Sequence, residues 1–119
     1  EYHDIDIALD TSPYTGGLTT CEALYMGVPV ITLRGETHAA RLGAAMLTAA
    51  GHADWIADDA RAYESLAVQM GEDIAGVRAR RSALRAGVEA SALMDARAYL
   101  AAFTSELERL WAAHGDFAL

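Results

Sequence analysis

Lysine is absent from this sequence, and the basic residues are nine arginines against seventeen acidic side chains, for a net charge of −8. Without lysine the chain cannot complete a P-loop, whose phosphate contacts include that residue. An acidic protein also holds nucleic acid and anionic membranes poorly, because binding at those surfaces depends on Lys and Arg. We therefore expect neither nucleic acid nor a membrane among the partners.

Cysteine is nearly absent as well. Cys21 is the single thiol, so no internal disulfide can form and a reducing compartment, the cytoplasm, is the expected location. No apolar run approaches the roughly 20 residues that a membrane-spanning helix needs. The sequence opens at Glu1 without a methionine or a signal-peptide pattern, which suggests a segment of a longer protein.

The remaining composition is that of an ordinary folded domain. Of the 119 residues, 53% are hydrophobic and 22% are charged, which is typical of a globular chain. This length is enough for a single hydrophobic core, so we expect one domain over residues 1–119. His3, His52 and His114 are scattered without the spacing of a zinc site, and we expect no metal and no cofactor.

The first third of the sequence has the pattern of a strand–turn–helix–strand unit. Residues 5–9 form a short apolar strand pattern, and residues 28–33 form a nearly continuous apolar run, as in strands covered on both faces. Between them, Pro and Gly indicate a turn over residues 10–18, and a short helix is expected over 19–26. Such a unit has a right-handed crossover and parallel strands.

The rest of the sequence is mainly helical. Apolar residues recur at helical spacing over 42–49, 63–70, 74–88 and 100–111, with one further short strand expected at 55–56. The last of these stripes is the strongest, and it is expected to belong to the core by default. The pattern predicts an α/β fold with a short parallel sheet and a helical C-terminal tail.

The segment most suited to binding a ligand is residues 10–22, DTSPYTGGLTTCE. They follow the carboxyl end of a strand and lead into a helix N-terminus, where ligands bind in open α/β sheets and where unpaired amides favour an anion. Gly16 and Gly17 permit close approach of a phosphate because they lack a Cβ. Thr19 and Thr20 add hydroxyl donors, and either of them could cap the helix.

Glu22 lies three residues after Thr19, so the two side chains share one helix face. A carboxylate in that position could accept hydrogen bonds from ribose hydroxyls while phosphates rest on the turn. The same residues also fit a plain tight turn, a capping threonine and a first-turn acid favoured by the helix dipole. The residues by themselves therefore indicate a turn shaped for an anion and leave its use open.

Read together, DIDIALDTSPYTGGLTTCEALYMGVPVITLRGETHAARLGAAML resembles the C-terminal lobe of the O-GlcNAc transferase and SPINDLY glycosyltransferases. The closest matches are TTCEALYMGVPVITL and the Gly-Glu-Thr-His-Ala that follows it. The resemblance implies a GT-B architecture, with two Rossmann-like lobes around the active site and usually tetratricopeptide repeats upstream. Such enzymes move a sugar from a nucleotide diphosphate to a Ser or Thr of a protein, inverting the anomeric centre without a metal.

The resemblance also implies roles for individual residues. Glu22 takes the ribose position. O-GlcNAc transferases have Asp at that position, and in having Glu there this chain resembles SPINDLY. Gly17 stands where O-GlcNAc transferases place a His, and Leu18 stands where a hydroxyl residue is common. The donor diphosphate is expected at Gly16, Gly17, Leu18, Thr19 and Thr20.

The resemblance places no catalytic residue in this segment. A lysine that assists the leaving diphosphate, the acceptor site and the N-terminal lobe would all lie before Glu1, so we expect the isolated chain to be inactive. Both UDP-GlcNAc and GDP-fucose remain possible donors, and the acceptor is a protein. The alternative is a non-catalytic nucleotide-sensing or protein-interaction module of the same fold, favoured by the departures at Gly17 and Leu18.

Other residues could line the same cleft. Glu36, His38 and Arg41 follow the second strand at the same sheet edge, although a solvated loop acid and a helix-face Arg are more often structural. Tyr14 could pack on the donor, and it fits a turn aromatic that closes over the core equally well. The last helix of GT-B enzymes often crosses to the other lobe, so part of the stripe around Trp111 could be exposed and favour self-association. A solvated helix face is expected for Arg78, Arg80, Arg81 and Arg85.

Overall fold

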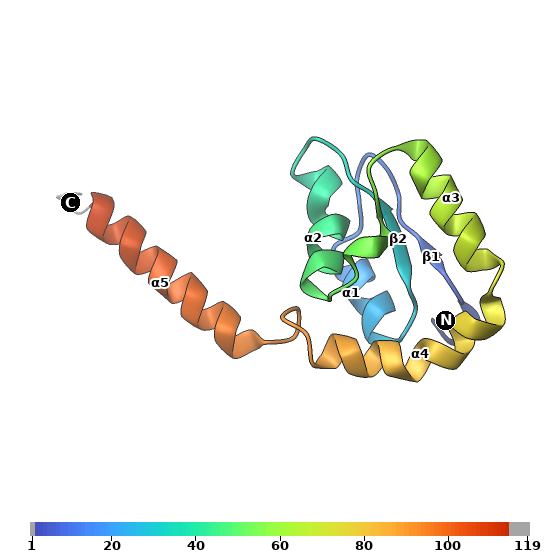
Figure 1. Ribbon diagram of the computed structural model, residues 1–119. Helices are drawn as coiled ribbons and strands as arrows, with labels where there is room; N and C mark the ends of the chain where they lie inside the picture. The colour runs from blue at the N-terminus through green and yellow to red at the C-terminus, as the bar shows by residue number, and fades with distance from the viewer. Residues whose placement is uncertain (1, 115–119) are drawn as a thin grey trace.

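An α/β body with one projecting helix makes up the protein, in a computed structural model that describes residues 2–114 (Figure 1). The projecting helix is α5 (Ala96–His114), which points away from the body at the C-terminal end of the described chain. Because of it, the molecule extends 61 Å along its longest axis and only 29 and 23 Å along the other two.

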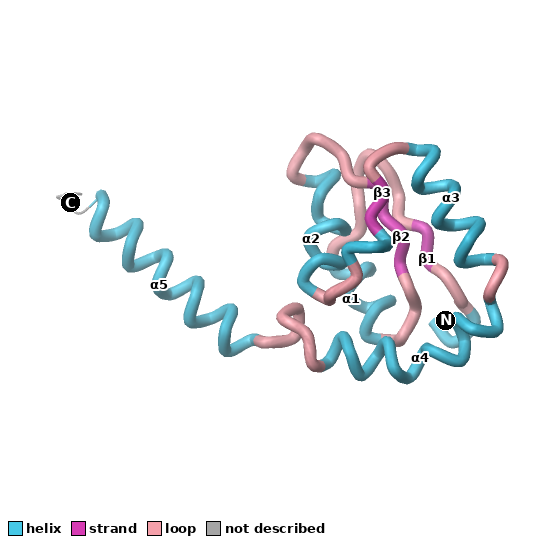
Figure 2. Tube along the Cα trace, in the orientation of Figure 1, coloured by secondary structure: helices cyan, strands magenta, loops and turns pink. Residues whose placement is uncertain are grey.

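The sheet has three parallel strands in the order β1-β2-β3, side by side between the helices (Figure 2). They are β1 (Ala8–Leu9), β2 (Val30–Leu33) and β3 (Ile56–Ala57). Parallel pairing confirms the predicted crossover unit, but β1 and β2 are shorter than predicted and β3 begins one residue later than predicted. Residues 5–7 follow a 3₁₀ turn over Tyr2–Asp4 and do not pair with β2.

Helix α1 (Leu18–Tyr25) connects β1 to β2 and begins one residue earlier than predicted. Its N-cap is Gly17, which offers no side chain to cap the helix. The prediction that Thr19 or Thr20 caps α1 is therefore wrong, because both lie inside the first turn. The helix ends before Gly27, whose φ of 73° is in the left-handed region that glycine tolerates.

Helices cover both faces of the sheet. Helices α1 and α2 (Leu42–Ala49) lie on one side, and α3 (Ala60–Gly71) lies on the other, while α4 (Ile74–Glu89) crosses below (Figure 1). In α2 the buried face is displaced by one position from the predicted stripe, since Ala44 is buried and Ala45 is exposed. The core cluster consists of Ala23, Leu24, Val28, Val30, Leu47, Ala50 and Val88.

Arg81 contradicts the prediction of a solvated arginine face on α4. Its guanidinium donates to the carbonyl oxygens of Met26 and Ile5, each at 3.1 Å, and to that of Tyr2. These carbonyls belong to the turn after α1 and to the segment before β1, so one side chain joins three parts of the chain. The other three arginines of the group are exposed and pair with Asp6, Asp73 and Glu89.

The apolar stripe of α5 is not core, which corrects the default expectation. No residue of α5 is buried among those described, and Trp111 is 76% exposed. The helix extends from the body, so none of the other elements covers its apolar side (Figure 1). The exposed stripe consists of Tyr99, Leu100, Phe103, Leu107, Leu110 and Trp111.

Candidate functional site

The site begins at Asp10, the first residue after β1. Its backbone N–H still donates to the carbonyl of Ile31, at 2.9 Å, so the residue is held at the carboxyl end of the sheet. The Asp10 carboxylate accepts from the backbone N–H of Thr11 at 2.9 Å and from that of Gly16 at 2.7 Å. Both bonds fold the turn, which includes a cis Ser12–Pro13 peptide bond, back over the end of β1.

Gly16 lies against the hydroxyl groups of the first turn of α1. A Cβ at this position would stand 2.5 Å from Thr20 Oγ1 and 2.8 Å from Thr19 Oγ1, which is closer than packing allows. At Gly17 a Cβ would meet no atom within 4 Å among residues 2–114, its two chain neighbours aside. Gly16 is therefore required by its surroundings, whereas the position of Gly17 is open for a side chain.

A cavity of about 210 Å³ lies beside this turn. Thr19 is exposed and Thr20 is buried, and both contribute to its wall, together with Asp10 and Gly16. Two threonines therefore line a hollow at the start of a helix, where backbone N–H groups lack partners within the helix. The full lining is Tyr2, Ala8, Leu9, Asp10, Thr11, Gly16, Thr19, Thr20, Ala23 and Val30.

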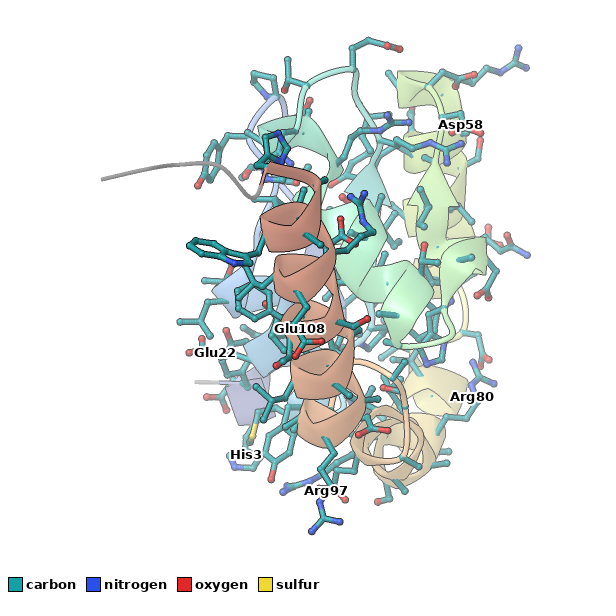
Figure 3. All side chains as sticks on the ribbon, turned by 90° about the vertical axis from the view of Figure 1, so that its left-hand side faces the viewer. His3, Glu22, Asp58, Arg80, Arg97 and Glu108 are labelled. Carbon is teal, nitrogen blue, oxygen red and sulfur yellow. The ribbon has the colours of Figure 1, made fainter. Side chains whose placement is uncertain are left out.

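Glu22, the candidate ribose acceptor, is exposed on α1 and contacts Tyr2. The Tyr2 hydroxyl donates to Glu22 Oε2 at 3.2 Å and approaches the carbonyl of Thr19 at 3.4 Å. Figure 3 shows Glu22 near the surface, on the side of the molecule where His3 also lies. Sequence reasoning missed Tyr2, because nothing in its local pattern indicates that the N-terminal turn folds against α1.

The four further cleft candidates are not part of the cavity wall. Tyr14 is 68% exposed, and Glu36, His38 and Arg41 are also exposed. Leu18, the first residue of α1, is 74% exposed and faces solvent. A role for these side chains in donor binding stays a prediction.

Two larger cavities, each about 530 Å³, lie elsewhere, between the segment before β3 and helices α3 and α4. They share Asp54, Trp55, Met70 and Arg80 and contain none of the predicted site residues. Size alone does not make them the site, because ligands of open α/β sheets bind at the carboxyl ends of the strands. Pro29, which lines one of them, precedes β2 and marks the opposite end.

Cys21 lies in α1, with its sulfur 3.5 Å from that of Met46. Burial raises the pKa of this thiol, so little thiolate forms near neutral pH, which fits a packing role better than a nucleophilic one. Among residues 2–114, no group of three or more His, Cys, Asp or Glu side chains could hold a metal ion. No helix in that same range is long and apolar enough to cross a membrane.

The sequence profile of glycosyl transferase family 41 matches residues 3–103. The chain belongs to glycosyl transferase family 41. This family 41 chain is 36% identical, over 115 residues, to the rice protein described as "Probable UDP-N-acetylglucosamine--peptide N-acetylglucosaminyltransferase SPINDLY". The alignment covers 97% of this chain and 12% of the rice protein. The corresponding SPINDLY of Arabidopsis thaliana is 34% identical over 92% of this chain, which again spans 12% of the relative.

The family 41 chain also resembles a solved structure, that of a mutant O-GlcNAc transferase from Thermobaculum terrenum. The TM-score is 0.69 at 36% identity, and the match covers 92% of this chain and 20% of that one. This confirms both the resemblance to O-GlcNAc transferases and SPINDLY and the α/β fold of a GT-B lobe. The chain therefore spans only a small part of the length of its relatives.

Proposed function

We propose that residues 1–119 are the donor-binding lobe of an inverting protein O-glycosyltransferase, which moves GlcNAc or fucose from a nucleotide diphosphate to Ser or Thr. The observation that carries the proposal is the packing of Gly16 against the hydroxyls of Thr19 and Thr20, beside a cavity at the carboxyl end of β1. A diphosphate is the chemistry that such a turn suits, because the start of the helix offers oriented backbone and hydroxyl donors.

The proposed role of the turn in the reaction is electrostatic. As the bond between sugar and diphosphate breaks, negative charge grows on the leaving group, and donors already oriented at the start of α1 stabilise it. The hydroxyls of Thr19 and Thr20 add two donors to the backbone N–H groups. Glu22 would accept from the ribose hydroxyls, in exchange for the hydrogen bond that it now receives from Tyr2.

The proposal assigns no catalytic residue to this chain. Upstream parts of the protein, namely an N-terminal lobe and tetratricopeptide repeats, would supply the acceptor site and a lysine for the leaving group. The isolated chain is therefore expected to bind donor nucleotide without transferring sugar. We place the protein in the cytoplasm, which agrees with its single, half-buried thiol.

Titration of the chain with UDP and, separately, with GDP tests the proposal by the backbone amide shifts in NMR spectra. Shifts centred on residues 15–22 that vanish in the Thr19→Ala, Thr20→Ala variant are expected. Thr104→Ala on the exposed helix α5 is the control and should bind as the wild type does. The nucleotide that binds more tightly identifies the sugar, since UDP carries GlcNAc and GDP carries fucose in the two donors considered.

A non-catalytic nucleotide-sensing or protein-interaction module is the second candidate. It is favoured by the open position of Gly17 and by the exposed Leu18, which together remove two side-chain contacts from the turn. The two candidates differ once the upstream lobe is restored. If the longer protein binds neither UDP nor GDP at millimolar concentration, the donor-lobe proposal fails and the module remains.

A further inference from the structure

The Asp10 carboxylate joins the proposed donor turn to strand β2. One oxygen, Oδ1, accepts from the N–H groups of Thr11 and Gly16, within the turn itself. The other oxygen, Oδ2, accepts from the hydroxyl of Thr32 at 2.8 Å. Thr32 lies on the central strand β2 and is completely buried. The Asp10 carboxylate thus attaches the turn to the central strand, in addition to the bond from the Asp10 backbone N–H to the carbonyl of Ile31.

Gly43, in the first turn of α2, packs against the hydrogen-bonded pair of Asp10 and Thr32. A Cβ there would overlap Asp10 Oδ2 and stand 2.6 Å from Thr32 Oγ1, so only glycine leaves room for the pair. The N–H of Gly43 donates to the hydroxyl of Thr15 at 3.0 Å, and that hydroxyl donates to the carbonyl of Ala39 at 2.9 Å. Two residues of the turn, Asp10 and Thr15, are therefore fixed against the start of α2.

We propose that Asp10 is a positioning residue for the donor site: it holds Gly16 against Thr19 and Thr20 and does not act by contact with the diphosphate. The inference rests on the proposed function for the identity of the ligand. It does not rest on it for the shape of the turn, because the partners of the Asp10 carboxylate are all groups of the chain itself.

Charge distinguishes positioning from direct contact. A carboxylate that touched a diphosphate would repel it, so the negative charge of Asp10 is useful only through the donors that it orients. Asparagine has the same shape, and its Oδ1 can accept from Thr11 and Gly16 as the carboxylate does. Its amide group can donate to the Thr32 hydroxyl, which also has lone pairs. Asp10→Asn should therefore preserve the turn, and Asp10→Ala should release it.

Two measurements on the 119-residue chain test the inference: hydrogen exchange of the Gly16 amide, and the affinity for UDP and GDP. We expect Asp10→Ala to accelerate exchange at Gly16 and to weaken nucleotide binding, each by about tenfold, the loss of roughly one charged hydrogen bond. Asp10→Asn should stay within about threefold of the wild type in both measurements. Gly43→Ala, which displaces the carboxylate without removing it, should behave like Asp10→Ala.

Asp59→Ala is the matched control, because the Asp59 carboxylate also accepts from a backbone N–H, that of Ala62 at 2.8 Å, but at the start of α3. It should leave exchange at Gly16 unchanged, which separates loss of the turn from loss of overall stability. If Asp10→Ala does not fold, Thr32→Val removes one arm of the network and should give a smaller change in the same direction.

The outcomes separate the inference from the proposed function. If the wild type binds neither nucleotide with the upstream lobe restored, the proposed function fails, and exchange at Gly16 still decides whether Asp10 holds the turn. The inference is overturned if Asp10→Ala leaves exchange at Gly16 as in the wild type. It is also overturned if Asp10→Asn tightens binding by about tenfold or more, because the carboxylate would then lie against the diphosphate and repel it.

Discussion

Gly16 and Gly17 are adjacent in the sequence and have different structural requirements. Gly16 has the two threonine hydroxyls where a side chain would be, whereas Gly17 faces open space at the N-cap of α1. A substitution at the first position would remove the close packing, while one at the second could add a contact. The donor turn therefore has one position that needs glycine and one that can be changed.

Gly17→His is predicted to tighten nucleotide binding by about tenfold, equal to about 1.4 kcal/mol. The imidazole would enter open space and could donate to a phosphate from the residue before α1. Isothermal titration with UDP and GDP measures the effect, and Gly17→Ala is the control that adds a Cβ without a donor. An affinity equal to that of the alanine variant would show that no phosphate lies within reach of this position.

At the scale of elements, α4 is attached to the N-terminal segment through Arg81. Arg81→Ala is predicted to lower the free energy of unfolding by about 2 kcal/mol, because three backbone carbonyls lose a charged donor. Arg80→Ala on the same helix removes only an exposed pair with Asp73 and should cost about 0.5 kcal/mol or less. Urea denaturation of both variants makes the comparison, and equal losses would contradict the assigned role of Arg81.

The sequence predicts the elements better than the ends and faces of those elements. Hydrophobic runs identify β2 and the helices, because strand and helix periods are local properties. Gly17 as the N-cap of α1 was missed, since glycine and threonine are comparable N-cap residues and the local sequence does not separate them. The partial burial of Arg81 was also missed, because its carbonyl partners come from segments remote in the sequence.

The candidate site was partly accessible from the sequence. Ligands of open α/β sheets bind at the turns after the parallel strands, and this rule predicts Gly16, Thr19 and Thr20 as site residues. All three residues line one cavity. The contacts of Asp10 and Tyr2 could be recognised only from the folded structure. Their partners lie on β2 and α1, more than a dozen residues away, and no local pattern specifies such pairs.

At the scale of the whole molecule, α5 determines the shape and the exposed apolar surface. A helix that carries an exposed apolar stripe buries it by association, so the chain is predicted to self-associate as its concentration rises. Leu107→Glu should shift this equilibrium toward the monomer by about tenfold or more, and Ser105→Glu, on the opposite side of α5, should have little effect. Sedimentation equilibrium distinguishes the two, and a wild type that is monomeric throughout would contradict the prediction.

The two tryptophans lie on different parts of the molecule. Trp55 is half-buried in the body and stacks on His52, with ring centroids 4.0 Å apart, whereas Trp111 is on α5 with most of its surface in solvent. Intrinsic fluorescence therefore contains two separable signals. The emission of Trp111 should move to shorter wavelengths when the projecting helix meets a partner, and the emission of Trp55 should change only when the body unfolds. Each half of the molecule thus carries its own optical label, without chemical modification.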